Sequence, residues 1–298
     1  MPISTERSFI AMQRFMNRQK MSDNEKQDWI KNRVGAPIPE IPFEELTDEE
    51  KAEDIAFDIL QEIEDGNLYY EDFKEMQEKA QLAINLCGTS LLALEAYFKT
   101  CMPKTKAHKV LDKGIMIGEQ LFGGDFEKEN EGHFWGLTQT RPYLRMLSSK
   151  AQRLEEQNHK KEAIQIYAKI IRLNPNDNQG SRFELQKLYL ELKQFDQFLD
   201  LIDQFEDEFE YSLQSQYNYA LYLYITLGEC EESDDALVDA ISFNPHVLPY
   251  LLGKKLNKHY ISKYTPTGED GATVYSQDNL YLWRKQVGIQ NWLRQFEE

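Results

Sequence analysis

Residues 173–182, LNPNDNQGSR, place amide and carboxylate side chains at the alternating spacing of a calcium-binding loop. Counted from Asn174, three asparagines occupy the first, third and fifth positions of an EF-hand loop. The sixth position, which requires glycine, is Gln179, and the twelfth, which requires glutamate, is Leu185. The segment therefore predicts no calcium site.

Helix termini explain the same polar residues better. Asn174 can end one helix, and Pro175 prevents that helix from continuing. Asp177 or Asn178 can cap the following helix by accepting hydrogen bonds from its first backbone amides. Arg182 is then expected to face a groove or an acidic side chain.

A second candidate site lies in EGHFWGLTQTRPYLR, residues 131–145. His133, Arg141 and Arg145 are residue types that occur in acid–base and anion sites, but the stretch contains no cysteine and no evident nucleophile–base pair. Aromatic residues such as Trp135 on an insertion are expected to cover an exposed helix edge. Packing is the favoured interpretation, and a hydrolase or transferase with a site around His133 and Arg141 is the alternative.

No other chemistry is indicated by the sequence. The remaining histidines have no metal-ligand spacing, and no phosphate-binding glycine motif occurs. The three cysteines form no CxxC motif, which suits a reducing cytoplasm. No apolar run is long enough to cross a membrane. We therefore expect a protein with no cofactor, no metal and no membrane association.

The negative charge is concentrated in two blocks of the chain. The formal net charge is −17; residues 36–80 hold 16 acids and 3 bases, and residues 178–243 hold 15 acids and 3 bases. Such blocks repel phosphate backbones, so we expect no binding to nucleic acid. They could steer a basic protein partner, or act as an acidic mimic that blocks a basic, nucleic-acid-binding surface.

Apolar periodicity predicts an all-α protein. One helical face is formed by Leu144, Leu147, Ala151 and Leu154, and a second by Ala163, Ile164, Tyr167, Ile170 and Ile171. The pattern recurs, since Pro245 follows Pro175 by 70 residues, which is two steps of 35.

This spacing resembles the tetratricopeptide repeat (TPR), a helix–turn–helix unit of about 34 residues. Ala163, Tyr167 and Pro175 match its second helix, and Ile170 departs from it. The resemblance implies repeats stacked in a right-handed superhelix, an α-solenoid, with a concave groove for a partner protein.

A longer resemblance involves GHFWG, TRPYLR, LNPNDNQGSR and NPHVLPYLLG, in this order. Together they are similar to bacterial relatives of the suppressor-of-tumorigenicity-seven-like TPR proteins. The composition also resembles that of secreted effectors of intracellular bacteria. The cytoplasm of a bacterium, or of its host, is the compartment this implies.

Five segments are predicted. Residues 1–45 form an N-terminal arm or linker, 46–122 N-terminal helical pairs, 123–142 an insertion loop, 143–247 three TPR-like repeats and 248–298 C-terminal capping helices.

The predicted function is a non-catalytic module that binds, and so regulates or scaffolds, a partner protein such as an effector or enzyme through its concave TPR groove. The predicted partner-binding residues are Arg145, Gln152, Arg182, Phe183, Lys187, Asn218, Tyr222, His133, Trp135 and Arg141.

Overall fold

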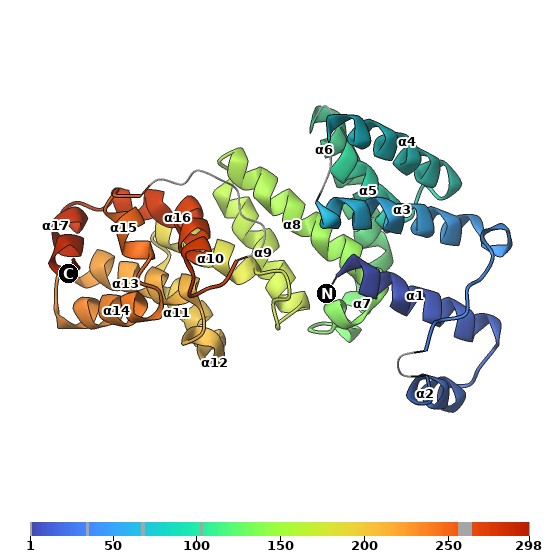
Figure 1. Cartoon of the computed structure of the whole chain (residues 1–298), viewed down its shortest axis with the longest axis horizontal. Helices are drawn as coiled ribbons and strands as arrows, with labels where there is room; N and C mark the ends of the chain where they lie inside the picture. Colours follow the sequence, from blue (N-terminus) through green and yellow to red (C-terminus); the bar gives the residue numbers. More distant parts are fainter. Residues whose placement is uncertain (1, 34–35, 67–68, 102–103, 256–263, 298) are drawn as a thin grey trace. The chain divides into compact units, whose positions relative to one another are not determined.

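The protein is built from α-helices. The structure, a computed structural model, describes residues 2–33, 36–66, 69–101, 104–255 and 264–297. Across these ranges it contains α-helices and short 3-10 turns but no strand, and successive helices pack in adjacent pairs (Figure 1). The predicted all-α class is confirmed, and the pairing is consistent with an α-solenoid. The chain divides into two compact units, 1–179 and 180–298.

Among its described residues, unit 1 contains nine helices, coloured from blue to yellow-green in Figure 1. They are α1 (Ile3–Arg18), α2 (Asp23–Lys31), α3 (Asp48–Asp65), α4 (Tyr70–Leu86), α5 (Leu91–Thr100), α6 (Lys104–Phe122), α7 (Asp125–Glu129), α8 (Arg141–Glu156) and α9 (Lys160–Leu173). The 3-10 turns η1 (Phe43–Glu45), η2 (Phe134–Gly136) and η3 (Thr138–Thr140) join them.

Helix α1 packs against α3 through complementary charges. Arg14 donates to Asp54 and Glu53 at 2.7 and 2.6 Å, and Arg18 donates to Glu50 at 2.8 Å. Glu50 also completes the capping box with Thr47 that the sequence predicts at the start of α3. The first acidic block therefore pairs in part with basic residues of the same unit.

Two glycines let α6 approach α8 closely. A Cβ atom on Gly114 would lie 2.5 Å from the sulfur of Met146, and one on Gly118 would lie 2.1 Å from Cδ2 of Tyr143. Real side chains do not come this close, so both positions require glycine at the observed spacing. The resulting contact places the buried face of α8 on α6.

The apolar faces predicted from periodicity form the interior of α8 and α9. Leu144, Ala151, Ala163 and Ile170 are fully buried, and Tyr167 is 1% exposed. Tyr167 also donates from its hydroxyl to Glu155 at 2.8 Å. Burial of this stripe, rather than helix propensity, holds the pair together.

The polar segment 173–182 is a connection between helices, as predicted, but its capping differs from the prediction. Asn174 is the C-cap of α9. The N-cap of the next helix is Gly180, at φ 75° and without a side-chain cap, so the prediction that Asp177 or Asn178 caps it is wrong. Asp177 instead takes a left-handed turn conformation at φ 42°, and its amide donates to the Asn174 carbonyl.

In the part of unit 2 that the structure describes there are eight helices, coloured from yellow to red in Figure 1. They are α10 (Ser181–Glu191), α11 (Phe195–Gln204), α12 (Glu206–Phe209), α13 (Leu213–Leu227), α14 (Glu231–Phe243), α15 (Val247–Leu251), α16 (Glu269–Arg284) and α17 (Ile289–Leu293), followed by the 3-10 turn η4 (Arg294–Phe296).

The long C-terminal helix α16 packs on both α10 and α13. Its Tyr275 and Trp283 are fully buried, and both rings contact Tyr217 of α13, with centroid separations of 5.3 and 6.3 Å. Helices α10 and α13, each the first helix of a packed pair in unit 2, are thus covered by α16.

Candidate functional site

The predicted contact residue Arg145 lies in a buried ion cluster. Its Nε and Nη2 atoms each donate to Glu95 at 2.8 Å, and its Nη1 donates to Glu6 at 2.9 Å. Glu6 and Glu95 are both 1% exposed. The guanidinium group of Arg145 thus joins α8 to α5 and α1, and its donors are directed to carboxylates inside unit 1.

The charges in this cluster stabilise one another. Burial raises the pKa of Glu95, but the positive charges of Arg145 and Lys99 and their hydrogen bonds outweigh burial and lower that pKa. Burial lowers the pKa of Arg145, and the two carboxylates more than reverse this and raise it. Both groups are therefore ionised at neutral pH.

Arg141 lies beside this cluster and is 5% exposed. Its Nη1 is 3.7 Å from Glu6, its Nε donates to the Trp135 carbonyl at 2.8 Å, and its guanidinium lies 5.2 Å from the Trp135 ring centre. Burial lowers the pKa of Arg141, with Glu6 opposing the change. Trp135 is half-buried and so retains part of its surface for contact.

His133 is exposed at the start of η2, next to the fully buried Phe134. Phe134 fills the space beside Phe122 and Phe126, with centroid distances of 6.4 and 5.8 Å. Among the described residues, no side chain bonds to the His133 imidazole. The orienting partner that a catalytic base needs is therefore missing from the described surroundings of His133, while the neighbouring Phe134 packs in the interior.

Gln152 is the predicted contact residue of α8 that faces solvent. It lines a cavity between α5, α6 and α8, together with side chains of both other helices.

Asn218 lies in a buried hydrogen-bond network of unit 2. It is fully buried, donates to Oε1 of Gln186 at 3.1 Å and accepts from the Tyr275 hydroxyl at 3.0 Å. The same hydroxyl accepts from Trp283 Nε1 at 2.8 Å. The network links α10, α13 and α16, so the polar atoms of Asn218 bond within the unit.

Three predicted residues lie together on α10. Arg182 pairs with Glu208, and its guanidinium lies 4.8 Å from the ring centre of Phe183 and 4.6 Å from that of Phe205. Lys187 pairs with Glu184, one turn away on the same helix. Arg182 thus faces an acid, one of the two environments that the sequence predicts for it, and two aromatic rings complete its surroundings.

Tyr222 belongs to a row of half-buried aromatic rings that the sequence analysis did not identify. Its ring centre is 5.6 Å from that of Phe195 and 5.9 Å from that of Tyr219, and Tyr219 is 5.6 Å from Phe209. We call these four residues the aromatic row. The three-residue spacing of Tyr219 and Tyr222 places both on one side of α13 and was the available signal.

Exposed carboxylates accompany the aromatic row. They lie on α11 and α12, the helices that carry Phe195 and Phe209, and at Glu210 directly after α12. The exposed acids of 195–210 are Asp196, Asp200, Asp203, Glu206, Asp207, Glu208 and Glu210. The aromatic row, carried by α11–α13, and these exposed acids of residues 195–210 are together named the aromatic–acidic face.

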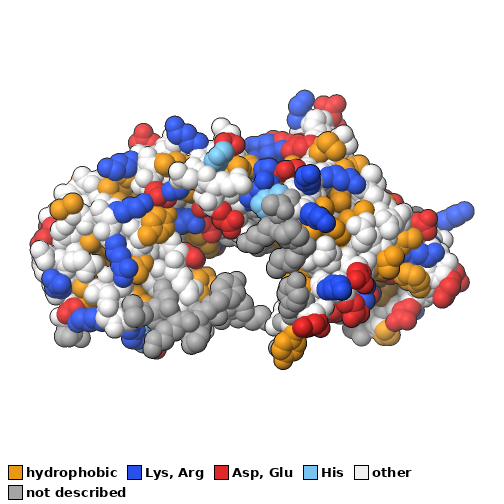
Figure 2. All heavy atoms as spheres, turned by 90° about the horizontal axis from the view of Figure 1, so that it is seen from above, with side chains coloured by type: hydrophobic (Ala, Val, Ile, Leu, Met, Phe, Trp, Pro, Cys, Tyr) orange, Lys and Arg blue, Asp and Glu red, His pale blue; other side chains and the backbone are white. Residues whose placement is uncertain are grey.

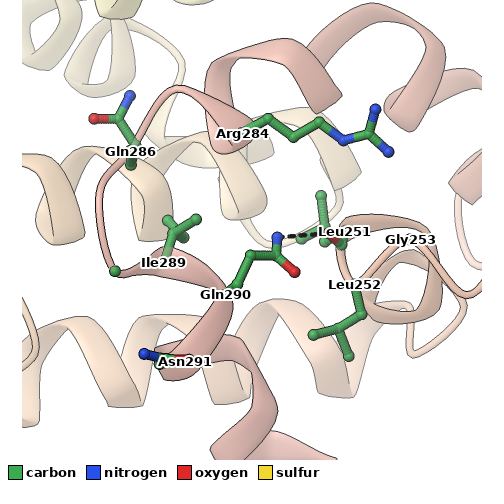
Figure 3. A pocket seen from close by; sticks show the side chains of 9 residues that line it. Leu251, Leu252, Gly253, Arg284, Gln286, Ile289, Gln290 and Asn291 are labelled. Atoms are coloured by element: carbon green, nitrogen blue, oxygen red, sulfur yellow. Dashed lines mark hydrogen bonds between the residues drawn. The ribbon is translucent and has the colours of Figure 1, made fainter.

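A further pocket of about 430 Å³ lies between α15, α17 and the end of α16 (Figure 3). Gln290 reaches across it and donates to the Leu251 carbonyl at 3.0 Å. Arg284 is the one charged residue that lines it, so its lining holds no acid–base pair. In the described part of the chain, no three His, Cys, Asp or Glu side chains are placed to share a metal ion.

The predicted residues belong to both units, and each group is described within its own unit. Arg141, Arg145 and Trp135 meet in unit 1, whereas Arg182, Phe183 and Tyr222 lie at or near the aromatic–acidic face of unit 2. Figure 2 shows acidic, basic and apolar side chains interspersed on one face of the molecule.

The comparisons with known proteins correct the family prediction. The family model described as Transcriptional repressor TCF25 matches residues 88–294. The predicted membership of the TPR family, and kinship with its bacterial relatives, is therefore wrong. No curated protein and no solved structure matches the chain. None of the helices in the described ranges has the length and apolar character needed to cross a membrane. Because the match spans more than half of the sequence, the chain belongs to the Transcriptional repressor TCF25 family.

Proposed function

We propose that this chain is a non-catalytic regulator that acts in transcriptional repression by binding a partner protein. We further propose that the partner contributes a basic segment and that the aromatic–acidic face of unit 2 receives it. Membership of a repressor family supports the first statement. The second rests on the chemistry of the face.

The observation that carries the proposal is the environment of Arg182. Its guanidinium contacts the rings of Phe183 and Phe205 and pairs with Glu208. Aromatic rings attract cations through their negative faces, and a carboxylate adds a charge-assisted hydrogen bond. This part of unit 2 therefore already holds one arginine in the manner proposed for an incoming one.

The aromatic row offers aromatic rings and nearby acids of the same kinds. Among the described residues, no lysine or arginine of the chain itself lies over the rings of this row. Tyr219 and Tyr222 are half-buried, so their rings are held rigidly while part of each remains accessible. Rigid aromatic residues are frequent anchors of protein interfaces. The exposed acids of α11 and α12 supply attraction at longer range, which speeds encounter with a basic partner.

A matched pair of peptides tests the binding mode. A dye-labelled peptide that alternates arginine and alanine is titrated against the chain, beside its counterpart with neutral citrulline at every arginine. We expect the arginine peptide to bind at least tenfold more tightly, and its affinity to fall as salt screens the charges. We expect Tyr222→Ala and Asp203→Lys each to weaken it.

The control variant reverses an exposed acid of unit 1, Glu62→Lys, which changes the net charge as much as Asp203→Lys does. If Glu62→Lys weakens the peptide as much as Asp203→Lys, the attraction is only that of the overall charge and the assignment to this face is wrong. Equal binding of the citrulline peptide would contradict the cation preference.

Repression itself is tested by tethering the chain to a reporter promoter through an unrelated DNA-binding domain. We expect reduced transcription, and recovery of transcription when Asp203, Glu206 and Glu210 are changed to lysine. If the tethered protein leaves transcription unchanged, the proposed role in repression fails even if peptide binding is observed.

The acidic mimic is the second candidate, and the aromatic–acidic face also favours it. If the basic segment belongs to a nucleic-acid-binding protein, the chain and DNA should compete for that segment. A DNA duplex added to the complex is then expected to release the chain, whereas release by salt alone at matched ionic strength would contradict direct competition. We propose that the chain itself does not bind the duplex.

A further inference from the structure

Unit 1 contains a cavity of about 260 Å³ between α5, α6 and α8, on a different unit from the aromatic–acidic face. Its apolar lining comes from Phe98 and Cys101 at the end of α5 and from Ala107 and Leu111 of α6. Cys101, Ala107 and Leu111 are almost fully buried, so this floor is preformed. The volume suits one large side chain and a small polar group, below the range usual for cofactors.

The polar wall of this cavity contains an incompletely bonded arginine. Nε and Nη1 of Arg153 are shielded from solvent and have no hydrogen-bond partner among the described residues. The carboxylate of Asp112 is 3.6 Å from Nη1, an ion pair beyond hydrogen-bond distance. Shielded donors without acceptors are unfavourable, and a carboxylate that enters the cavity and pairs with the Arg153 guanidinium would offset part of this cost through its charge.

The electrostatic surroundings favour an anion. Residues 99–113 carry five lysines and one aspartate in a chain of net charge −17. Burial, followed by the charge of Arg153, lowers the pKa of the half-buried His108 that lines the cavity.

One acidic side chain limits how much negative charge fits. Glu156 also lines the cavity, at its exposed rim. A carboxylate there repels a doubly charged phosphate or a run of acids more than it repels one carboxylate. The other polar lining residues, Ser149 and Gln152 of α8, add neutral groups, and Lys99 is held by Glu95 at 3.0 Å.

We propose that this cavity binds a single carboxylate next to a large apolar side chain of a peptide, with the carboxylate on Arg153 and the apolar group on Phe98 and Leu111. A peptide C-terminus that ends in a hydrophobic residue provides both groups. An internal glutamate beside a leucine provides the same chemistry. This site is independent of the proposed binding of a basic segment.

Three dye-labelled peptides distinguish these sources. They are N-acetyl-Ala-Ala-Leu with a free carboxylate, the same peptide as its C-terminal amide, and N-acetyl-Ala-Glu-Leu amide. Fluorescence anisotropy with the full chain is expected to show at least tenfold tighter binding of the free acid than of the neutral amide. Tighter binding of the glutamate peptide than of the free acid would assign an internal acid as the source.

The variant that tests the arginine is Arg153→Gln, which is expected to abolish the preference for the acid over the amide. Lys109→Gln is the matched control, because Lys109 is exposed on α6, outside the lining, and its loss removes the same charge. Thermal unfolding of each variant shows whether the fold is retained. If Arg153→Gln unfolds, Arg153→Lys keeps the charge and is expected to lose most of the preference.

Three results would overturn the proposal. They are equal binding of acid and amide, no binding of any of the peptides, and a preference that Arg153→Gln leaves unchanged in a folded protein. None of these results bears on the arginine peptide or the reporter, so the failure of this proposal and of the proposed function are separable.

Discussion

Arg145 and Glu95 form a two-point ion pair inside unit 1, with Nε and Nη2 of the arginine each 2.8 Å from a carboxylate oxygen. Nη1 of the same guanidinium donates a hydrogen bond to Glu6 at 2.9 Å. One side chain of α8 is thereby held by acids of α5 and α1. Arg145, on the polar side of α8, is therefore expected to stabilise the packing of α8 against α5 and α1.

We expect Arg145→Ala to lower the free energy of unfolding by about 3–5 kcal/mol, because two buried carboxylates lose their hydrogen bonds to it. They keep as charged partners Lys99, at 3.0 Å from Glu95, and Arg141, at 3.7 Å from Glu6. Urea denaturation followed by circular dichroism measures the change. Lys79→Ala is the control, since Lys79 pairs with Glu75 at the surface and its loss should cost less than about 1 kcal/mol. Similar losses for both variants would show that the buried pair has no special weight.

The same pair predicts a loss of stability in acid. The pKa of Glu95 is lowered in the folded protein, so the unfolded chain binds a proton at this group at a higher pH than the folded chain does. The stabilisation is therefore complete above about pH 4.3, the ordinary pKa of glutamate, and is lost as the pH falls through the folded pKa.

Urea denaturation at a series of pH values from neutral to about pH 3 checks this, with Glu95→Gln as the reference that cannot titrate at this position. We expect the wild-type protein to lose more stability over the acid range than the variant loses. Parallel curves for the two proteins would assign acid sensitivity to other carboxylates.

The close contact of α6 with α8 gives a prediction about a single methyl group. Gly118→Ala would place a Cβ 2.1 Å from Cδ2 of Tyr143, whose hydroxyl is held by Glu119 at 2.6 Å and by Lys169 at 3.0 Å. Because that ring cannot turn away without losing these bonds, we expect a loss of about 1–3 kcal/mol despite the better helix propensity of alanine.

Differential scanning calorimetry measures the change in unfolding temperature. Gly136→Ala is the control, because a Cβ atom there meets nothing within 4 Å. An unchanged unfolding temperature for Gly118→Ala would show that the helices adjust their separation easily.

The helices were predictable from the sequence because burial follows apolar spacing. Leu147, Ala151 and Ala163 are buried as their periodicity predicts. The family could not be predicted in this way. The 35-residue step, which fits twice between Pro175 and Pro245, reflects the length of two short helices and their turns. Any protein built from paired helices of this length shows such a step, so the period indicates the architecture and not the ancestry.

The surroundings of the polar residues were not predictable in the same way. From local spacing alone, Arg145 is predicted to face solvent on α8. The structure places Glu6, 139 residues earlier in the chain, beside it. Asn218 likewise reads as exposed on α13, because nothing in its own helix indicates that α16 covers it. Local spacing predicts which side of a helix is apolar. It does not predict which residues a polar side chain contacts, because these depend on the tertiary structure.

The covering of α13 by α16 leads to the last prediction. The hydroxyl of Tyr275 donates to Asn218 at 3.0 Å and accepts from Trp283 at 2.8 Å, in a fully buried position. Tyr275→Phe keeps the ring but leaves a buried indole N–H and a buried amide oxygen without this partner. We expect it to lower the free energy of unfolding by about 1–3 kcal/mol.

Urea denaturation of the variant measures this loss, and Tyr211→Phe is the control because Tyr211 is 74% exposed. A double-mutant cycle with Asn218→Leu separates the Tyr275–Asn218 bond from the bond to Trp283. We expect the two changes together to cost less than the sum of their separate effects, because each removes one end of the same bond. Strict additivity would show that the Tyr275 hydroxyl contributes nothing to stability through Asn218.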